Sequence, residues 1–492
     1  MRALLFACAG VLLAAQAPSS PGVETIMIDT SAPARPFPHF WEQMFGSGRA
    51  TLSLREDWRN DLRAVKRVSD VQYIRFHGIF DDDAGVYKED AHGRPVYNFS
   101  YVDRIYDGLL ANGVRPFVEL SFMPKALSAT DHLHAFWYKP YPNPPKDYKR
   151  WDDLIQAFVK HLQGRYGNAE VEKWYFEVWN EPNIDFWTGE PKDTTYYELY
   201  DQTVDAVKAV NPKLRVGGPA TSAAAWIEPF LAHCTEKHVP VDFVSTHVYG
   251  NNSSEDVFGK PGKLDRLHMT ARAVRMVHDQ VKRSAFPNAP IIWSEYNATY
   301  MNEVKVTDSP YMGPWLANNI RECDGLTAMM SYWTFSDVFE EQGVVERPFY
   351  GGYGLMAEDN VPKAAYNDFA LLHRLGMKRI PNNSTDVLVT KRENGSLALA
   401  LWNYADPDTS GSPRRFHLVF RGMASPHLRV QVVDREHGSA LTAWEAMGRP
   451  DFPSRDQEAK LREAARLPSA RTTSDATLRL EPNALALVEV LP

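Results

Sequence analysis

The chain has 492 residues, of which 44% are hydrophobic and 12% aromatic, so it holds enough apolar material for a large core. Its 62 acidic and 54 basic residues give a formal net charge of −8, and no block of Lys and Arg stands out. This balance argues against the basic surface that nucleic-acid binding needs, and we expect no nucleic-acid partner.

The first 17 residues have the pattern of a secretory signal peptide. Arg2 gives a positive start, residues 3–15 are apolar, and Ala15-Gln16-Ala17 is a small-x-small cleavage sequence. A buried N-terminal strand or helix is the alternative. We expect residues 1–17 to be removed and the protein to be secreted or periplasmic. No later apolar run reaches transmembrane length, so we expect no membrane partner.

The mature chain would keep Cys234 and Cys323. Two cysteines are not a disulfide framework, and no CxxC pair is present to hold zinc. We expect two buried free thiols, with a single disulfide bond as the alternative. The sequence also has no HExxH motif, Asp-rich calcium loop or Gly-rich phosphate turn, so we expect no metal and no cofactor.

Between residues 40 and 360, strand-like apolar runs alternate with helix-like stretches. Several runs are almost entirely apolar, as expected for parallel strands that are covered on both faces. The eight runs are 40–45, 71–76, 115–120, 174–179, 214–217, 241–246, 290–294 and 328–333. They predict an α/β fold, a (β/α)8 TIM barrel with expected bounds 36–365.

The rest of the chain has a different pattern. Short runs of alternating apolar residues predict an accessory antiparallel β-sandwich, formed by residues 18–35 and 366–492. The runs are 385–391, 396–403, 415–420, 428–434, 476–480 and 484–491. Residues 24–29 alternate weakly and are expected at an edge of the sandwich. Residues 440–468 are charged and helix-prone, and are expected to form an insertion.

The segment Trp174-Tyr-Phe-Glu-Val-Trp-Asn-Glu-Pro182 puts two polar side chains at the end of the fourth predicted strand. Barrel active sites lie at the C-terminal ends of the strands, so Asn180 and Glu181 are expected to face the substrate. Pro182 cannot continue the strand ladder and ends the strand there. A solvated loop glutamate is the alternative.

Ile291-Ile-Trp-Ser-Glu295 repeats this layout at the end of the seventh predicted strand. Strands four and seven lie across the barrel mouth from each other, so Glu181 and Glu295 can act on one bond. Hydrolysis of a glycosidic bond uses such a pair. One carboxyl group protonates the leaving oxygen, which calls for a raised pKa, and the other attacks the anomeric carbon or activates water. The two glutamates therefore predict a glycosidase.

Three segments resemble glycoside hydrolase family 39, and in particular its bacterial β-xylosidase branch. They are Phe176-Glu-Val-Trp-Asn-Glu-Pro182, Ser294-Glu-Tyr-Asn297 and Ser331-Tyr-Trp-Thr-Phe-Ser-Asp-Val-Phe-Glu-Glu341, and the last is the most specific. The resemblance covers roughly residues 36–380. It implies retention of configuration, with Glu181 as acid/base and Glu295 as nucleophile, and a contact between Asn180 and the sugar 2-hydroxyl.

The resemblance implies further sugar-binding candidates at strand ends, with less weight. They are His77, His247, Tyr249, Trp333, Glu340 and Glu341. Each has a structural alternative: His247 can be a hydrogen-bonded core histidine, Tyr249 can orient Glu295 or simply pack, and the aromatic ring of Trp333 can fill the barrel interior. Glu340 and Glu341 can be solvated loop acids.

The predicted function is an exo-acting β-D-xylosidase that releases xylose from short β-1,4-xylo-oligosaccharides. An α-L-iduronidase-like enzyme or an arabinosidase on the same scaffold is one alternative. A uronic acid needs a cation in the pocket, and the loops after strands seven and eight offer only Lys305 and Arg347. A catalytically silent carbohydrate-binding barrel is the other alternative, and the two opposed glutamates argue against it.

Overall fold

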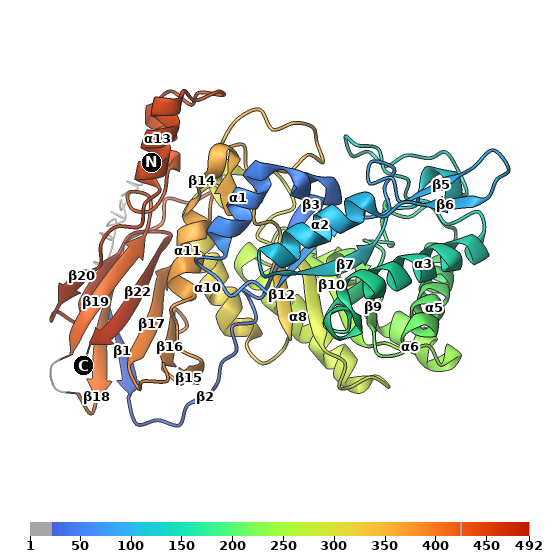
Figure 1. Ribbon diagram of the computed structural model, residues 1–492. Helices are drawn as coiled ribbons and strands as arrows, with labels where there is room; N and C mark the ends of the chain where they lie inside the picture. The colour runs from blue at the N-terminus through green and yellow to red at the C-terminus, as the bar shows by residue number, and fades with distance from the viewer. Residues whose placement is uncertain (1–21, 424–425, 492) are drawn as a thin grey trace, which may run out of the picture.

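Eight parallel strands close into a barrel in the computed structural model, which describes residues 22–423 and 426–491 (Figure 1). They are β3 (Met44–Arg49), β4 (Tyr73–His77), β7 (Arg115–Leu120), β8 (Tyr175–Val178), β9 (Arg215–Thr221), β10 (Phe243–Tyr249), β11 (Ile291–Asn297) and β12 (Met329–Tyr332). The pairing of β12 with β3 closes the ring. The predicted (β/α)8 barrel is confirmed, and each expected run overlaps one of these strands.

The first strand lies four residues later than expected. The run 40–45 predicted a strand because it is apolar, but β3 is Met44-Phe-Gly-Ser-Gly-Arg49. Its glycines are required by close packing: a Cβ atom on Gly46 would lie 2.2 Å from the Trp333 ring. Phe40 and Trp41 are buried just before the strand, so their apolar signal is real but belongs to the segment that enters it.

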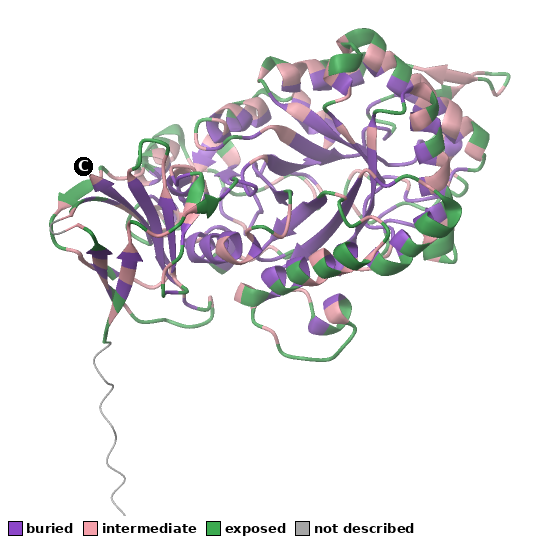
Figure 2. Ribbon diagram, turned by 90° about the horizontal axis from the view of Figure 1, so that it is seen from below, coloured by how far each residue is buried: buried purple, intermediate pink, exposed green. Residues whose placement is uncertain are grey.

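Helices cover the outside of the barrel, and Figure 2 shows the buried strands enclosed by helices with exposed outer faces. The long ones are α1 (Glu56–Val65), α2 (Ser100–Ala111), α3 (Tyr148–Tyr166), α5 (Lys192–Val210), α6 (Ile227–Lys237), α8 (Arg266–Arg283), α10 (Met312–Cys323) and α11 (Ala364–Leu372). In α3 the buried residues Trp151, Ile155 and Phe158 recur every three or four positions, which gives one apolar face toward the sheet.

Short elements fill the loops of the barrel. They are the helices α4 (Asn168–Val171), α7 (Ser254–Phe258) and α9 (Val304–Thr307), the 3₁₀ turns η1 (Ala50–Leu54), η2 (Lys125–Leu127), η3 (Ser222–Ala224) and η4 (Glu358–Asn360), and the strand pairs β5 (Tyr87–Glu89) with β6 (Pro95–Tyr97) and β13 (Met356–Ala357) with β14 (Val361–Pro362). Of these, η3 and α7 follow β9 and β10 and lie at the substrate end of the barrel.

The sandwich has a seven-stranded sheet in the order β2-β15-β16-β17-β22-β19-β20 and a three-stranded sheet in the order β1-β18-β21. The strands are β1 (Val23–Asp29), β2 (Arg35–Pro36), β15 (Lys378–Ile380), β16 (Val387–Lys391), β17 (Leu397–Asn403), β18 (Arg414–Arg421), β19 (His427–Val433), β20 (Arg471–Thr473), β21 (Thr477–Leu480) and β22 (Ala484–Leu491). Their inward side chains form a core of their own. The pairs in the larger sheet are antiparallel, as expected, but edge strand β1 runs parallel to β18.

Helices α10 and α11 pack against β17, β19 and β22 and so join the two parts (Figure 1). Helix α11 crosses residue 365, where the sequence placed the boundary. In the region expected to be a helical insertion, α12 (Leu441–Ala446) and α13 (Arg455–Ala464) form.

Cys234 and Cys323 are buried and free. None of the helices within the described residues is long and apolar enough to cross a membrane. The signal peptide expected at residues 1–17 lies outside the described residues.

Candidate active site

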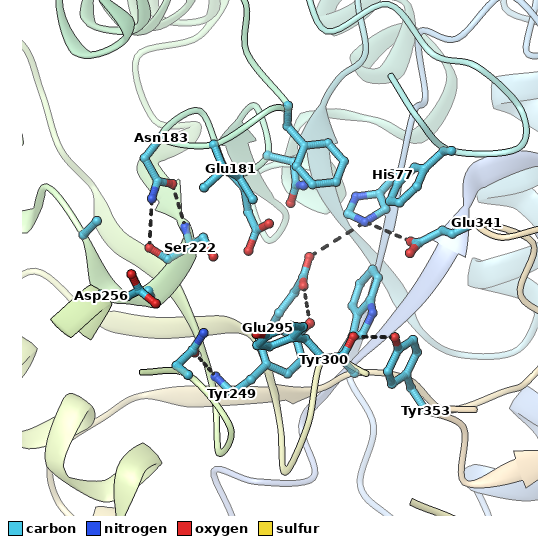
Figure 3. Close-up of a pocket in the computed structure, with 18 residues that line it drawn as sticks. His77, Glu181, Asn183, Ser222, Tyr249, Asp256, Glu295, Tyr300, Glu341 and Tyr353 are labelled. Atoms are coloured by element: carbon cyan, nitrogen blue, oxygen red, sulfur yellow. Dashed lines mark hydrogen bonds and ion pairs between the residues drawn. The ribbon is translucent and has the colours of Figure 1, made fainter. Parts of the chain in front are cut away.

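A cavity of about 590 Å³ opens at the C-terminal ends of the barrel strands (Figure 3). Its size lies within the range of small-ligand pockets. Its wall brings together residues that are far apart in sequence, among them His77 after β4, Glu181 after β8, Tyr249 on β10 and Glu295 on β11. The sequence placed these side chains at strand ends, and the closed barrel is what makes them neighbours.

Glu181 is held in an uncommon backbone conformation beside β9. Its φ is +44°, in the left-handed region that non-glycine residues rarely adopt. Its N–H donates to the carbonyl oxygen of Ala220 over 2.8 Å, which fixes the strained turn. Such strain persists where the surrounding structure imposes it, and it is concentrated at functional sites. Burial raises the pKa of Glu181 to about 7, against the opposing effect of a hydrogen bond from Ser222.

Glu295 is buried on the facing strand and its carboxylate is held on both oxygens. The Nη1 atom of Arg75 donates to Oε1 over 2.8 Å, and the hydroxyl of Tyr249 donates to Oε2 over 2.6 Å. An oxygen of Glu295 and an oxygen of Glu181 lie within 4.8 Å of each other. The two carboxyl groups therefore differ in surroundings: one is bound by donors and a cation, and the other is desolvated.

Arg75 is fully buried below the cavity and joins four side chains. It donates to Glu119, Glu177 and Glu295 and to the side-chain oxygen of Asn180, at 2.6–2.8 Å. Burial disfavours the charged guanidinium, but the three carboxylates outweigh it and raise the pKa of Arg75 above its ordinary value. The sequence analysis missed this network, although a charged residue inside an apolar strand is a signal that could have found it.

The side-chain oxygen and the NH₂ group of Asn180 have different roles. The oxygen accepts from Nη2 of Arg75 over 2.8 Å, and the side chain lines the cavity. Because the oxygen is occupied, the NH₂ group is the end available to a ligand. This arrangement gives a donor next to both carboxyl groups.

His77 connects a second carboxylate pair to the cavity. Its Nδ1 lies 2.8 Å from Oε2 of Glu119, and its Nε2 lies 3.5 Å from Oε1 of Glu341. Burial favours the neutral ring, but Glu119 and Glu295 outweigh it and raise the pKa of His77 to about 9. Burial raises the pKa of Glu341 to about 8, against the effect of His77. Both residues line the cavity, as expected.

His247 is completely buried behind Glu181 and is not on the cavity wall. Its Nδ1 lies 2.9 Å from Oε1 of Glu181 and its Nε2 lies 3.1 Å from Oγ of Ser294. Burial lowers the pKa of His247 to about 4, so the ring is neutral near pH 7. The structure therefore replaces the expected sugar contact by a contact with the carboxyl group of Glu181.

Glu340 is the other sequence candidate that the structure places elsewhere. It is buried and bound by Arg49 at 2.9 Å and by Arg55 at 2.7 Å, outside the cavity. Its neighbour Glu341 points into the cavity instead. In the loop after β12, the two consecutive side chains therefore point to different places, one toward Arg49 and Arg55 and the other into the cavity. Glu340 was expected to contact the sugar, but in the structure it forms ion pairs that hold the loop.

Aromatic side chains complete the wall. Trp333 and Tyr249 line the cavity, as the sequence indicated. The remaining lining residues, aromatic and not, were missed by the sequence analysis because they lie in the connections between strands and helices, short helix α7 included. They are Phe136, Asn183, Ile184, Phe186, Ser222, Ala223, Ala225, Asn252, Asp256, Tyr300 and Tyr353.

No Lys or Arg is among the described residues that line the cavity. Lys305 pairs with Asp408 and Arg347 with Asp451, each at 3.3 Å on the surface. Two groups among the described residues have the composition of a cation site: Glu181, His247 and Glu295 at the cavity floor, and His39, Glu42 and His373 at the other end of the barrel. Glu295 accepts from Tyr249, and Glu42 lies 2.7 Å from His39 and 2.8 Å from His373.

The chain is similar to known glycosidases along most of its length. A β-xylosidase of Geobacillus stearothermophilus is 38% identical over 84% of each chain, and one of Caldicellulosiruptor saccharolyticus is 35% identical over 87% of this chain and 88% of that one. The crystal structure of a monomeric β-xylosidase from Caulobacter crescentus CB15 matches 96% of this chain and 100% of its own, with a TM-score of 0.85 and 33% identity. Residues 24–478 match the family described as glycosyl hydrolases family 39. The protein is thus a member of glycosyl hydrolase family 39.

Proposed function

We propose that the protein is a retaining exo-β-D-xylosidase that releases xylose from short β-1,4-xylo-oligosaccharides. The observation that carries this proposal is the pair Glu181 and Glu295, whose nearest oxygens lie within 4.8 Å. Retaining glycosidases hold their two carboxyl groups about 5–5.5 Å apart, whereas inverting enzymes leave about 6.5–9.5 Å for a water molecule. The close pair supports attack by a carboxylate rather than by water.

In the first step, an oxygen of Glu295 attacks the anomeric carbon while Glu181 gives its proton to the leaving oxygen. The raised pKa of Glu181 keeps that proton in place up to about pH 7. In the second step, Glu181 takes a proton from water, and the water oxygen displaces Glu295 from the sugar. Arg75 and Tyr249 orient Glu295, and the NH₂ group of Asn180 is positioned to donate to the 2-hydroxyl.

The similarity to β-xylosidases of three bacteria supports xylose as the sugar that is released. The cavity wall supports a neutral sugar rather than an iduronide, because no Lys or Arg of the described chain lines it and the charge of His77 is already met by Glu119 and Glu341. The inner end of the cavity, where His77 and Trp333 are buried, would take the terminal sugar.

The test is hydrolysis of xylobiose and xylotriose by the purified protein, followed by proton NMR. We expect xylose from the non-reducing end, with the β-anomer as the first product. Aryl α-L-iduronide and aryl α-L-arabinoside serve as comparison substrates. An α-anomer as first product would contradict retention, and turnover of the iduronide alone would contradict the sugar assignment.

We also propose that residues 1–17 direct export and are then removed, so that the enzyme meets its substrate in the periplasm or outside the cell. The positive start, the apolar stretch and the Ala15-Gln16-Ala17 sequence support this. N-terminal sequencing of protein secreted by a bacterial host should find the first residue at or shortly after position 18. Retention of Met1 in an exported protein would contradict the proposal.

A further inference from the structure

The cavity has a second end that the chemistry described so far does not use. In Figure 3, His77 and Glu341 lie on one side of the catalytic pair, and Asn183, Ser222 and Asp256 lie on the other. We propose that this second end is a leaving-group subsite that binds a neutral sugar through Asp256 and rejects a leaving group that carries a carboxylate. The proposal rests on the proposed function, because it assigns Glu181 as the acid that protonates the leaving oxygen.

The wall of this subsite is fixed by a bridge between two loops. The side-chain oxygen of Asn183 accepts from the N–H of Ser222 over 2.8 Å, and its NH₂ group donates to the Ser222 carbonyl over 3.1 Å. Asn183 follows β8 and Ser222 follows β9, so one side chain ties the loop that carries Glu181 to the loop after the next strand. A subsite built on such a bridge is preformed and needs no ordering when a sugar binds.

The end of β9 and the loop after it are strained, and the loop carries only small side chains toward the cavity. Ala220 in β9 and Ala223, Ala224 and Trp226 after it all have φ between +51° and +62°, which is unfavourable for residues other than glycine. Strain of this kind, repeated within seven residues, indicates a conformation that the surrounding structure imposes for function. Its result is that Ser222, Ala223 and Ala225 line the cavity and leave room beside Glu181.

Beside this wall, two polar side chains can hydrogen-bond to sugar hydroxyls. The oxygen of Asn252 accepts from the N–H of Tyr249 over 2.6 Å, and no described residue accepts from its NH₂ group, which stays a donor. The Oδ2 atom of Asp256 accepts from the Ser253 hydroxyl over 2.6 Å, while Oδ1 has no partner among the described residues and stays an acceptor. A hydroxyl both donates and accepts, so this pair suits it.

Apolar surface also lines the cavity. Tyr300 is 51% exposed and Ile184 is 37% exposed. Sugars combine hydroxyl edges with apolar C–H faces, so a cavity lined by both polar and apolar groups fits a pyranose. These exposed groups gain contacts only when a ligand covers them.

The charge of the cavity determines which leaving groups it accepts. Its acids are Glu181, Glu295, Glu341 and Asp256, and the cation among the described lining residues, His77, lies beside Glu341 at the opposite end of the cavity (Figure 3). Asp256 is the one at the second end, next to the place of the leaving group (Figure 3). Asp256 is exposed at the rim of the cavity, so a carboxylate on the leaving group would meet a like charge there, whereas an unbranched xylose would not.

The experiment compares two aryl xylosides of equal size, 4-carbamoylphenyl and 4-carboxyphenyl β-D-xyloside. We expect the wild type to favour the neutral amide by at least about tenfold in kcat/KM, and Asp256→Asn to shrink that preference by at least about fivefold. The variant also lowers kcat/KM on xylobiose more than on the neutral aryl substrate, because the lost acceptor serves sugar hydroxyls. Asn keeps an oxygen for the Ser253 hydroxyl, so the helix cap is retained.

Glu255→Gln is the matched control, since Glu255 precedes Asp256 on α7, is exposed and does not line the cavity. It removes the same charge and should leave both ratios unchanged. If Asp256→Asn leaves the charge preference and the xylobiose rate unchanged, or if Glu255→Gln shifts them equally, the subsite is wrong while the xylosidase activity stands. If the wild type hydrolyses no xyloside, the proposed function fails and the subsite falls with it.

Discussion

Arg75 on β4 and Glu295 on β11 are joined by a hydrogen bond of 2.8 Å across the interior of the barrel. Their strands are not neighbours, because β12 and β3 lie between them in the sheet. The same guanidinium also binds Glu119 and Glu177, so one cation is shared by three buried carboxylates. The position of Glu295 is thus fixed by the Arg75 network, which lies inside the barrel under the cavity.

Replacing Arg75 with Met should therefore affect folding as well as activity. Three carboxylates would be left without their cation, and breaking a buried charge network typically costs about 3–5 kcal/mol. We expect a fall of that size in the free energy of unfolding by urea denaturation. Arg115→Met is the control, because its pair with Glu170 is partly exposed and should contribute about 1 kcal/mol or less. Equal losses in the two variants would contradict the network's importance.

Glu181→Ala should separate substrates by their leaving groups. Without the acid, we expect kcat on xylobiose to fall by about 10²–10⁴-fold, whereas 2,4-dinitrophenyl xyloside needs no proton and should still be cleaved in the first step. Azide fits the space left by the carboxyl group and should restore the second step, giving a β-xylosyl azide. Near wild-type turnover of xylobiose would remove Glu181 from this role.

Glu295→Ala should abolish turnover of every substrate, because no covalent intermediate can form whatever the leaving group. The positive test is labelling of the wild type with an activated 2-fluoro-xyloside, followed by peptide mapping. We expect the label on the peptide that contains Glu295 and no label in the variant. A label on Glu341 or Glu181 would falsify the assignment.

The fall of kcat/KM on the basic side of the pH profile should follow the deprotonation of Glu181. The pKa of Glu181 is raised to about 7, so the proton needed for catalysis is present below that pH and lost above it. We expect kcat/KM on xylobiose to decline by up to tenfold per pH unit above about pH 7. For 2,4-dinitrophenyl xyloside the same limb should be absent or shifted upward. Identical limbs for the two substrates would assign the titration to another group.

Sequence reasoning found the features that leave a local signal. Buried parallel strands are apolar runs, and a carboxylate at the end of such a run is visible without any partner, which is why Glu181 and Glu295 stood out. Arg75, Glu119 and Glu177 each leave a signal as a charge inside an apolar strand, but their pairing leaves none, since they lie on different strands and only the closed barrel brings the carboxylates to one guanidinium. Distant pairing of this kind is decided by topology.

Loop residues were the second blind spot. Glu340 and Glu341 are neighbours in one motif, yet one is ion-paired to Arg49 and the other faces the cavity. No periodicity distinguishes them, because the loop after β12 follows no regular pattern. Tyr300 lies on another irregular loop, and Asp256 lies on the short helix α7, whose position at the cavity depends on packing against the barrel rather than on local preference.

The preference for a pentose is the last prediction. A hexose carries a hydroxymethyl group where xylose carries hydrogen, and a pocket closed at that point rejects the larger sugar by crowding. The inner end of the cavity is walled by buried side chains, among them His77, Phe186 and Trp333, which cannot move aside without disturbing the core. We expect kcat/KM for aryl β-D-xyloside to exceed that for aryl β-D-glucoside by at least roughly tenfold, or about 1.4 kcal/mol in transition-state binding. Aryl α-L-arabinoside, also a pentoside, should show weak activity. Equal or faster turnover of the glucoside would rule out a pentose pocket and leave the roles of Glu181 and Glu295 untouched, because those roles depend on the glycosidic bond and not on the group at C5.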